Sequence, residues 1–143
     1  MRRRIHDTVP PMRLLTLVSI LLLLLGCKSN PVTDLPDPLY AKVRTFEDVV
    51  RWGALEKMYL FLKYDPEAPP VQIPPGLDNV RVTGYEEAGR MTEISPGRWA
   101  QTVVIDYVLT DRQVVRQVVD QQVWVSDDEG KSWYRENPVP EFR

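Results

Sequence analysis

The sequence predicts an α+β fold, in which an N-terminal helical pair packs on one face of a curved antiparallel sheet of about four strands. Apolar residues recur at steps of three and four over residues 39–63, which is the spacing of one helix face. Residues 80–136 are rich in valine and aromatic residues that alternate with polar ones, as in half-buried strands. The two patterns follow one another along the chain, which favours segregated helices and strands.

The helical segment carries its apolar residues at Leu39, Val43, Phe46 and Val50, and continues to Phe61. Gly53 interrupts this pattern directly after Trp52. A glycine at this place can end a helix in a left-handed cap and allow a second helix to start at a new angle. We therefore expect helices over 39–52 and 54–63, or one helix bent at Gly53.

The segment 65–78 (DPEAPPVQIPPGLD) is too rich in proline for a regular element. It is expected to be a stiff crossing loop, with Val71, Ile73 and Leu77 pinning it to the core.

Four strand segments follow the crossing loop. The first has a break or bulge at Ala88-Gly89, and the last two are joined by a hairpin loop whose Gly130 suits a positive φ. They are expected at 80–94, 99–109, 113–125 and 132–136. In 99–109 the apolar residues Trp99, Val103, Ile105, Tyr107 and Leu109 share one face, which only Gln101 interrupts.

The pairing of the two long strands can be predicted from their residues. A three-residue loop would place Leu109 opposite Gln113. Asp106 would then face Arg116, a cross-strand ion pair, and Val104 would face Val118. This register gives the Asp106 carboxylate a structural role, with ligand contact and catalysis as the less favoured alternatives.

The N-terminal stretch Leu14–Cys27 has the form of a secretion signal, because arginines precede an apolar run that ends in a small residue. Its end, Leu-Leu-Gly-Cys, resembles the lipobox of bacterial lipoproteins. The resemblance implies cleavage between Gly26 and Cys27 and a lipid on Cys27. The expected organisation is a signal peptide over 1–26, a lipidated Pro-rich tether over 27–38, and an α+β domain over 39–143.

The resemblance also implies a location. In the familiar enterobacterial pattern, Asp after the cysteine retains a lipoprotein in the inner membrane, and here Lys28 follows. We therefore expect the protein in the inner leaflet of the outer membrane, facing the periplasm. The full chain has 18 Lys and Arg and 20 Asp and Glu residues, and removal of 1–26 takes four arginines and one aspartate, which leaves a formal charge of −5. Such an acidic chain has no electrostatic reason to bind nucleic acid.

The residue types exclude much chemistry from the mature chain. His6 is the only histidine and lies in the signal, and Cys27 is the only cysteine. Zinc sites and Ser-His-Asp or Cys-His arrangements therefore cannot form. We expect no metal, no cofactor and no catalytic residues.

Two helices with a Trp-Gly corner, a Pro-rich crossing and long strands resemble the cystatin-like/NTF2-like superfamily. The stretches RWG…LEKMYLFL and W…PVPEF are similar to those of small uncharacterised proteobacterial lipoproteins. Enzymes of the superfamily include isomerases and hydratases that work through Asp and Tyr. The resemblance therefore implies a candidate ligand pocket at Tyr85, Asp106, Tyr107 and Arg116, with Asp120 as a further carboxylate.

The function expected from these observations is a lipid-anchored, periplasm-facing module that binds or scaffolds without catalysis. The alternatives are a binder of small apolar ligands in a helix–sheet pocket and a histidine-free isomerase or hydratase of NTF2-like type. Val114, Val118 and Trp124 make one side of strand 113–125 apolar. We expect this side to be the outer sheet face, available to a homodimer partner or another envelope protein. The alternative is a monomer whose outer face simply mixes apolar and polar residues.

Overall fold

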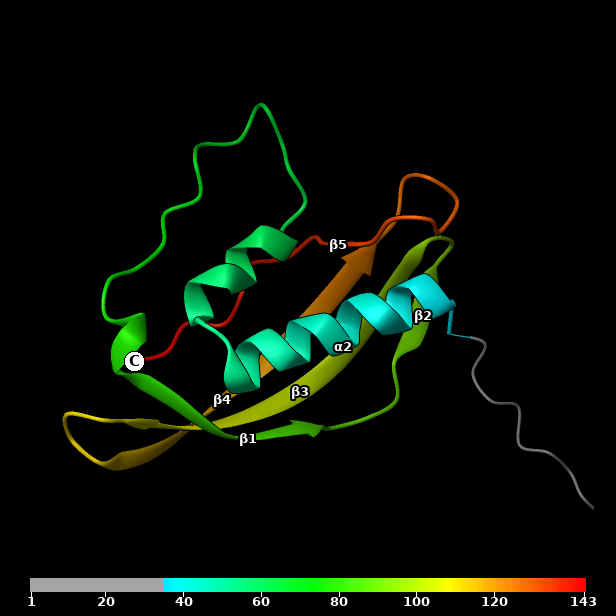
Figure 1. Cartoon of the computed structure of the whole chain (residues 1–143). Helices are drawn as coiled ribbons and strands as arrows, with labels where there is room; N and C mark the ends of the chain where they lie inside the picture. Colours follow the sequence, from blue (N-terminus) through cyan, green and yellow to red (C-terminus); the bar gives the residue numbers. More distant parts are fainter. Residues whose placement is uncertain (1–34) are drawn as a thin grey trace, which may run out of the picture. The chain divides into compact units, whose positions relative to one another are not determined.

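The computed structural model describes residues 35–143, so the predicted signal peptide and nearly all of the predicted tether lie outside the described residues. The described chain runs through one α-helix, two 3₁₀-helices and five strands (Figure 1). In chain order these are α2 (Asp37–Trp52), η1 (Leu55–Phe61), η2 (Leu77–Asn79), β1 (Val80–Glu87), β2 (Thr92–Ser95), β3 (Arg98–Leu109), β4 (Val114–Val125) and β5 (Tyr134–Arg135).

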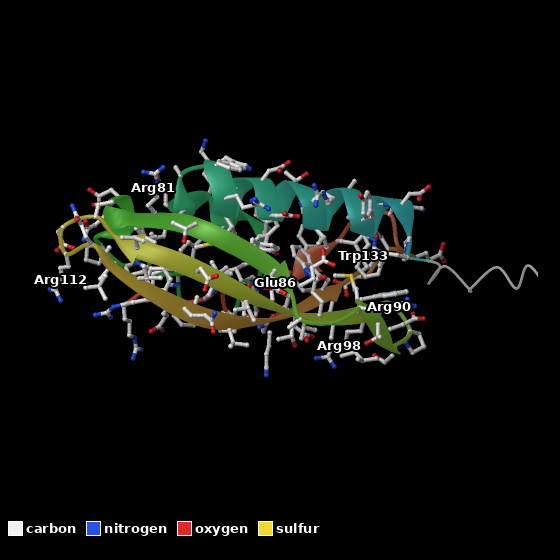
Figure 2. All side chains as sticks on the ribbon, turned by 90° about the horizontal axis from the view of Figure 1, so that it is seen from below. Arg81, Glu86, Arg90, Arg98, Arg112 and Trp133 are labelled. Carbon is white, nitrogen blue, oxygen red and sulfur yellow. The ribbon has the colours of Figure 1, made fainter. Side chains whose placement is uncertain are left out.

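The strands form one antiparallel sheet in the order β1-β3-β4-β5, and β2 pairs with β3 beyond the end of β1. The α+β prediction is therefore confirmed, including the break that separates β1 from β2 at Ala88-Gly89. Figure 2 shows the helices along one face of the sheet, while no helix of the described chain covers the other. We call these the inner face and the outer face.

Helix α2 buries the apolar stripe that the sequence predicts, namely Leu39, Val43, Phe46 and Val50. The helix ends at Gly53, but not by a left-handed cap, because Gly53 has an extended backbone with φ −94°. A Cβ at this position would lie 2.8 Å from the carbonyl oxygen of Val49. Close backbone approach therefore explains the glycine.

No helix of the described residues has the length and apolarity needed to span a membrane.

The second predicted helix is a 3₁₀-helix of seven residues, η1. Its buried residues are Leu55, Met58 and Phe61, each three positions from the next. A 3₁₀-helix has three residues per turn, so this spacing aligns all three side chains on one face. An α-helix would spread the same three side chains over about 120° of its circumference.

The core between the helices and the inner face is centred on Trp124 of β4, whose side chain is fully buried. Its ring meets Phe46 of α2 edge-on at 5.5 Å and Phe61 of η1 at 6.3 Å between ring centroids. Phe46 and Phe61 also meet edge-on, at 5.2 Å. This aromatic cluster ties the sheet to both helices.

The predicted partnership of β3 with β4 is confirmed, but the predicted register is wrong by one residue. Leu109 pairs with Val114, so Asp106 faces Gln117 and Tyr107 faces Arg116. The connecting loop has four residues because Gln113 adopts a left-handed conformation, with φ 51°, and stays outside the ladder. A one-residue change in register exchanges the two faces of β4 relative to β3. Arg116 therefore lies on the face opposite Asp106, and the predicted Asp106–Arg116 pair does not form.

The Trp124 cluster predicts a large difference between two tryptophans. Trp124→Ala should lower the free energy of unfolding by about 3–5 kcal/mol, because it leaves a cavity against two aromatic rings. Trp52→Ala is the control, since Trp52 is 78% exposed, and should change it by about 0.5 kcal/mol or less. Urea denaturation followed by circular dichroism measures both; equal losses would contradict this account of the core.

Candidate functional site

The four residues of the predicted pocket do not form one group, although Tyr107 and Arg116 are cross-strand partners. Tyr85, Tyr107 and Arg116 occupy inner-face positions, because they pair with or lie beside the buried positions of β3. Asp106 alternates with the buried residues of β3 and lies on the outer face. None of the four lines any of the three surface cavities described below.

Tyr107 and Arg116 both contact the C-terminal segment. The Tyr107 hydroxyl donates to the carbonyl oxygen of Arg143 at 2.8 Å, and the Arg116 guanidinium donates to the same oxygen. The ring of Phe142 meets Tyr107 edge-on at 5.1 Å. These contacts hold residues 142–143 against the sheet, and they account for both side chains structurally.

Asp106 accepts a hydrogen bond from the side-chain amide of Gln117 at 2.8 Å. Gly84 of β1 lies on its other side, where a Cβ would come within 2.9 Å of the carboxylate. The glycine thus makes room for Asp106 at the β1 bulge between Val82 and Gly84. The carboxylate is a cross-strand polar contact of the outer face.

The most deeply buried charges are those of Asp120 on β4 and Arg135 on β5. Their side chains are 2% and 0% exposed, and the guanidinium binds both carboxylate oxygens. Arg135 also donates to the carbonyl oxygens of Asn137 and Pro138, at 3.1 and 2.7 Å. The pair is therefore bidentate and further satisfied by main-chain acceptors, as a buried ion pair requires.

Gln122 connects this pair to the rest of the polar interior. Its amide nitrogen donates to Asp120 and to the Tyr85 hydroxyl, both at 2.9 Å. Its carbonyl oxygen accepts from Gln101 at 2.8 Å and from the Trp124 indole at 3.1 Å. Within residues 35–143 no buried side-chain nitrogen or oxygen lacks a partner.

This network was not predicted, although the sequence contained one sign of it. Gln101 is the single polar residue on the apolar face of 99–109, and a buried amide needs a partner. That partner is Gln122, directly opposite on β4. Only the observed register places the two amides together.

Burial raises the pKa of Tyr85 well above its usual value of 10, and the nearby carboxylates of Asp120 and Glu47 add to the effect. The hydrogen bond from Gln122 acts in the opposite direction but is the smaller influence. Tyr85 therefore stays neutral in the folded protein and serves as a hydrogen-bond acceptor within the network.

The outer face differs from the predicted one in its residues. Val114, Val118 and Trp124 occupy inner-face positions, where Trp124 is fully buried and Val118 packs against the core. The outer face instead presents alternating apolar and polar pairs between β3 and β4. These pairs are Ala100–Val123, Thr102–Gln121, Val104–Val119, Asp106–Gln117 and Val108–Val115. Val115 and Val119 are 71% and 56% exposed.

A groove of about 840 Å³ lies between the Pro-rich loop, η1 and the C-terminal segment. Val71 and Ile73 line it and are 57% and 51% exposed, so of the three loop residues expected in the core only Leu77 is buried. A second groove of about 790 Å³ lies where the end of α2 meets β1, and a third of about 300 Å³ borders the 88–92 segment. All three are on the surface of the domain.

In the described residues no group of three or more His, Cys, Asp or Glu side chains is placed to hold a metal ion. Comparison of the chain with protein-family models, with curated proteins and with solved structures gave no match. The fold itself, a small α+β domain with a curved antiparallel sheet, is compatible with the NTF2-like and cystatin-like architecture.

Tyr85 leads to a prediction about alkaline stability. Because its pKa is raised on folding, its neutral form stabilises the fold below pH 10, and this contribution is lost as the pH rises further. Tyr85→Phe should cost about 1 kcal/mol at pH 7 through the lost hydrogen bond. The decline in stability above pH 10 should be shallower in this variant than in wild type.

Denaturation curves at several pH values between 8 and 12 test this, with tyrosinate absorbance as a second measurement. Tyr64→Phe is the control, because Tyr64 is 84% exposed. An equally steep alkaline decline in wild type and Tyr85→Phe would contradict the role given to Tyr85.

Proposed function

We propose that this protein is a lipid-anchored module of the bacterial envelope that faces the periplasm and binds or scaffolds another protein surface without catalysis. The N-terminal part of the proposal rests on the arginines, the leucine run and the Gly26-Cys27 ending. It includes the finer resemblance to small proteobacterial lipoproteins and the expected outer-membrane location. The remainder rests on how the domain distributes its apolar and charged groups.

The observation that carries the binding function is the outer face. Val104, Val108, Val115 and Val119 form two apolar pairs across β3 and β4, and the two on β4 are more than half exposed. Exposed apolar residues bordered by polar ones are typical of protein interaction sites. Here the polar pair Asp106–Gln117 lies between the two valine pairs, and Thr102–Gln121 borders them on one side.

The interior supports binding over catalysis. An isomerase or hydratase of this fold needs a carboxylate poised as a base inside a cavity between helices and sheet. Asp120 is the carboxylate in that position, and it is bound on both oxygens by Arg135. The core between the helices and the sheet is filled by the aromatic rings of Trp124, Phe46 and Phe61, which are all buried.

The second candidate function is the binding of a small apolar ligand. It is favoured by the groove at Val71 and Ile73, since apolar residues exposed inside a concave surface are common in ligand sites. The sequence predicts a pocket between the helices and the sheet, whereas this groove lies beside the Pro-rich loop.

Substitution of two valines with nearly equal exposure distinguishes the two candidate functions. Val119, on the outer face, is 56% exposed, and Val71, in the groove, is 57% exposed. A photoreactive residue introduced at Gln121 should form an adduct with the bound protein in intact cells. Val119→Lys should abolish that adduct because a charge would be buried against the partner, whereas Val71→Lys should leave it unchanged.

Denaturation of the purified variants checks that each changes stability by about 0.5 kcal/mol or less, as for exposed positions. The absence of an adduct in the unsubstituted background, or its persistence in Val119→Lys, would contradict the proposed function. Loss of a ligand-dependent thermal shift in Val71→Lys alone would favour the second candidate.

The anchor is tested by Cys27→Ser. This variant should lose incorporation of radiolabelled fatty acid and should accumulate as uncleaved precursor, or leave the membrane fraction after extraction. Ser29→Ala, two residues further along the tether, should be labelled like the wild type. Undiminished labelling of Cys27→Ser would contradict the lipoprotein proposal.

A further inference from the structure

The edge of β4 is only partly covered. β4 pairs with β3 over its whole length, but β5 reaches only Trp124 and Val125 on the opposite side. Next to β5, the side chain of Asn137 accepts a hydrogen bond from the Val123 N–H at 2.8 Å and donates one to the Gln121 carbonyl. The edge is therefore covered from Val125 as far as Gln121. Between Val115 and Val119, none of residues 35–143 pairs with this edge.

The direction of the main-chain groups along this edge follows from the contacts of Asn137 and Glu136. Val123 and Gln121 direct their N–H or C=O groups away from β3, toward Asn137 and Glu136. Main-chain groups alternate in direction along an antiparallel strand with a period of two. Val119, Gln117 and Val115 therefore present their N–H and C=O groups outward, as a strand open to pairing.

The opposite edge of the sheet is different. β1 has a bulge between Val82 and Gly84, and its exposed residues include Arg81, Glu86 and Glu87. Bulges and charges of this kind protect sheet edges from pairing. The open part of β4 reads Val-Val-Arg-Gln-Val-Val over 114–119, with one charge and neither glycine nor proline. Only β4 has the composition of a pairing edge.

We propose that β4 pairs antiparallel with β4 of a second copy of this chain, with Gln117 on the two-fold axis. The inference rests on the proposed function and deepens it, because it names a partner for the β4 edge that borders the outer face. Two-fold pairing about an axis normal to the sheet keeps the outer faces of both copies on the same side. Residues directly opposite one another must then both be outer-face or both be inner-face residues.

The choice of Gln117 follows from the observed register of β3 and β4. With Gln117 on the axis, Val119 lies opposite Val115 of the second copy, and Gln117 lies opposite Gln117. The row Val104–Val119 of one copy then continues into the row Val115–Val108 of the other. Moving the axis by one residue in either direction would set Gln117 opposite Val115 or Val119 and interrupt these rows. The continuity of the rows therefore favours an axis at Gln117.

This pairing explains why valines are exposed on β4 at Val115 and Val119. Val119 of one copy and Val115 of the other would cover one flank of each other, and the open main-chain groups of both strands would gain partners. Because the two open edges are both consumed, the assembly closes as a dimer and does not extend into a filament.

A single cysteine at the axis tests the proposal in the full chain carrying Cys27→Ser, purified in detergent. Gln117→Cys should give a disulfide-linked dimer on mild oxidation, because opposed residues that exchange main-chain hydrogen bonds have Cα atoms ~5.5 Å apart, within disulfide range. Gln121→Cys is the matched control on the same strand and face. Its two copies would lie about 26 Å apart at ~3.3 Å per residue and should not cross-link.

Gln117→Pro provides a second measurement. The N–H of Gln117 points away from β3, so proline removes the pairing donor and leaves the main-chain ladder between β3 and β4 intact. The one bond it removes inside the described chain is the exposed side-chain contact of Gln117 with Asp106, which Gln117→Cys also removes. Light scattering should give a dimer for wild type and a monomer for Gln117→Pro, with unchanged circular dichroism. Equal cross-linking of the two cysteine variants, a monomeric wild type, a ladder of larger species, or a dimeric Gln117→Pro would overturn the self-pairing.

These outcomes are separable from a failure of the proposed function. A monomeric chain that still forms the Gln121 adduct in cells, at a mass other than twice its own, overturns the self-pairing and leaves outer-face binding intact. An adduct of twice the chain mass that is lost in Val119→Lys supports both. A monomeric chain that forms no adduct overturns both.

Discussion

The buried ion pair between Asp120 and Arg135 is the constraint on which the described fold depends. Neither charge reaches solvent, and loss of either partner would leave the other uncompensated, at a cost of about 3–5 kcal/mol. The guanidinium also lies over the ring of Phe46, 5.2 Å from its centroid. One side chain thus links β4, the C-terminal segment and α2.

The pair also explains how so short a strand as β5 is held. Two residues form too little ladder to be stable by themselves, but Arg135 within β5 binds Asp120 and the carbonyl oxygens of residues 137 and 138. Asn137 is thereby placed against the edge of β4, where it pairs with Val123 and Gln121. The same interaction that closes the interior therefore decides how much of the β4 edge remains open.

Local periodicity predicted the elements well, because helix and strand patterns depend on near neighbours in the sequence. Helix α2, the break after β1 and the buried side of β3 were all expected. The register was not, because it depends on Gln113 adopting a positive φ, which a residue other than glycine rarely does. A register that counts Gln113 in the ladder gives Asp106 the wrong partner and places Val118 and Trp124 on the wrong face. It also misses the pairing of Gln101 with Gln122.

The position of Arg135 along the chain has a consequence for the order of folding during synthesis. The helices and β1 to β4 emerge from the ribosome before Arg135 does, and until then Asp120 is a carboxylate without its cation. Burying it at that stage would be unfavourable, which disfavours early closure of the aromatic cluster around β4. Premature folding of the nascent chain is thereby opposed.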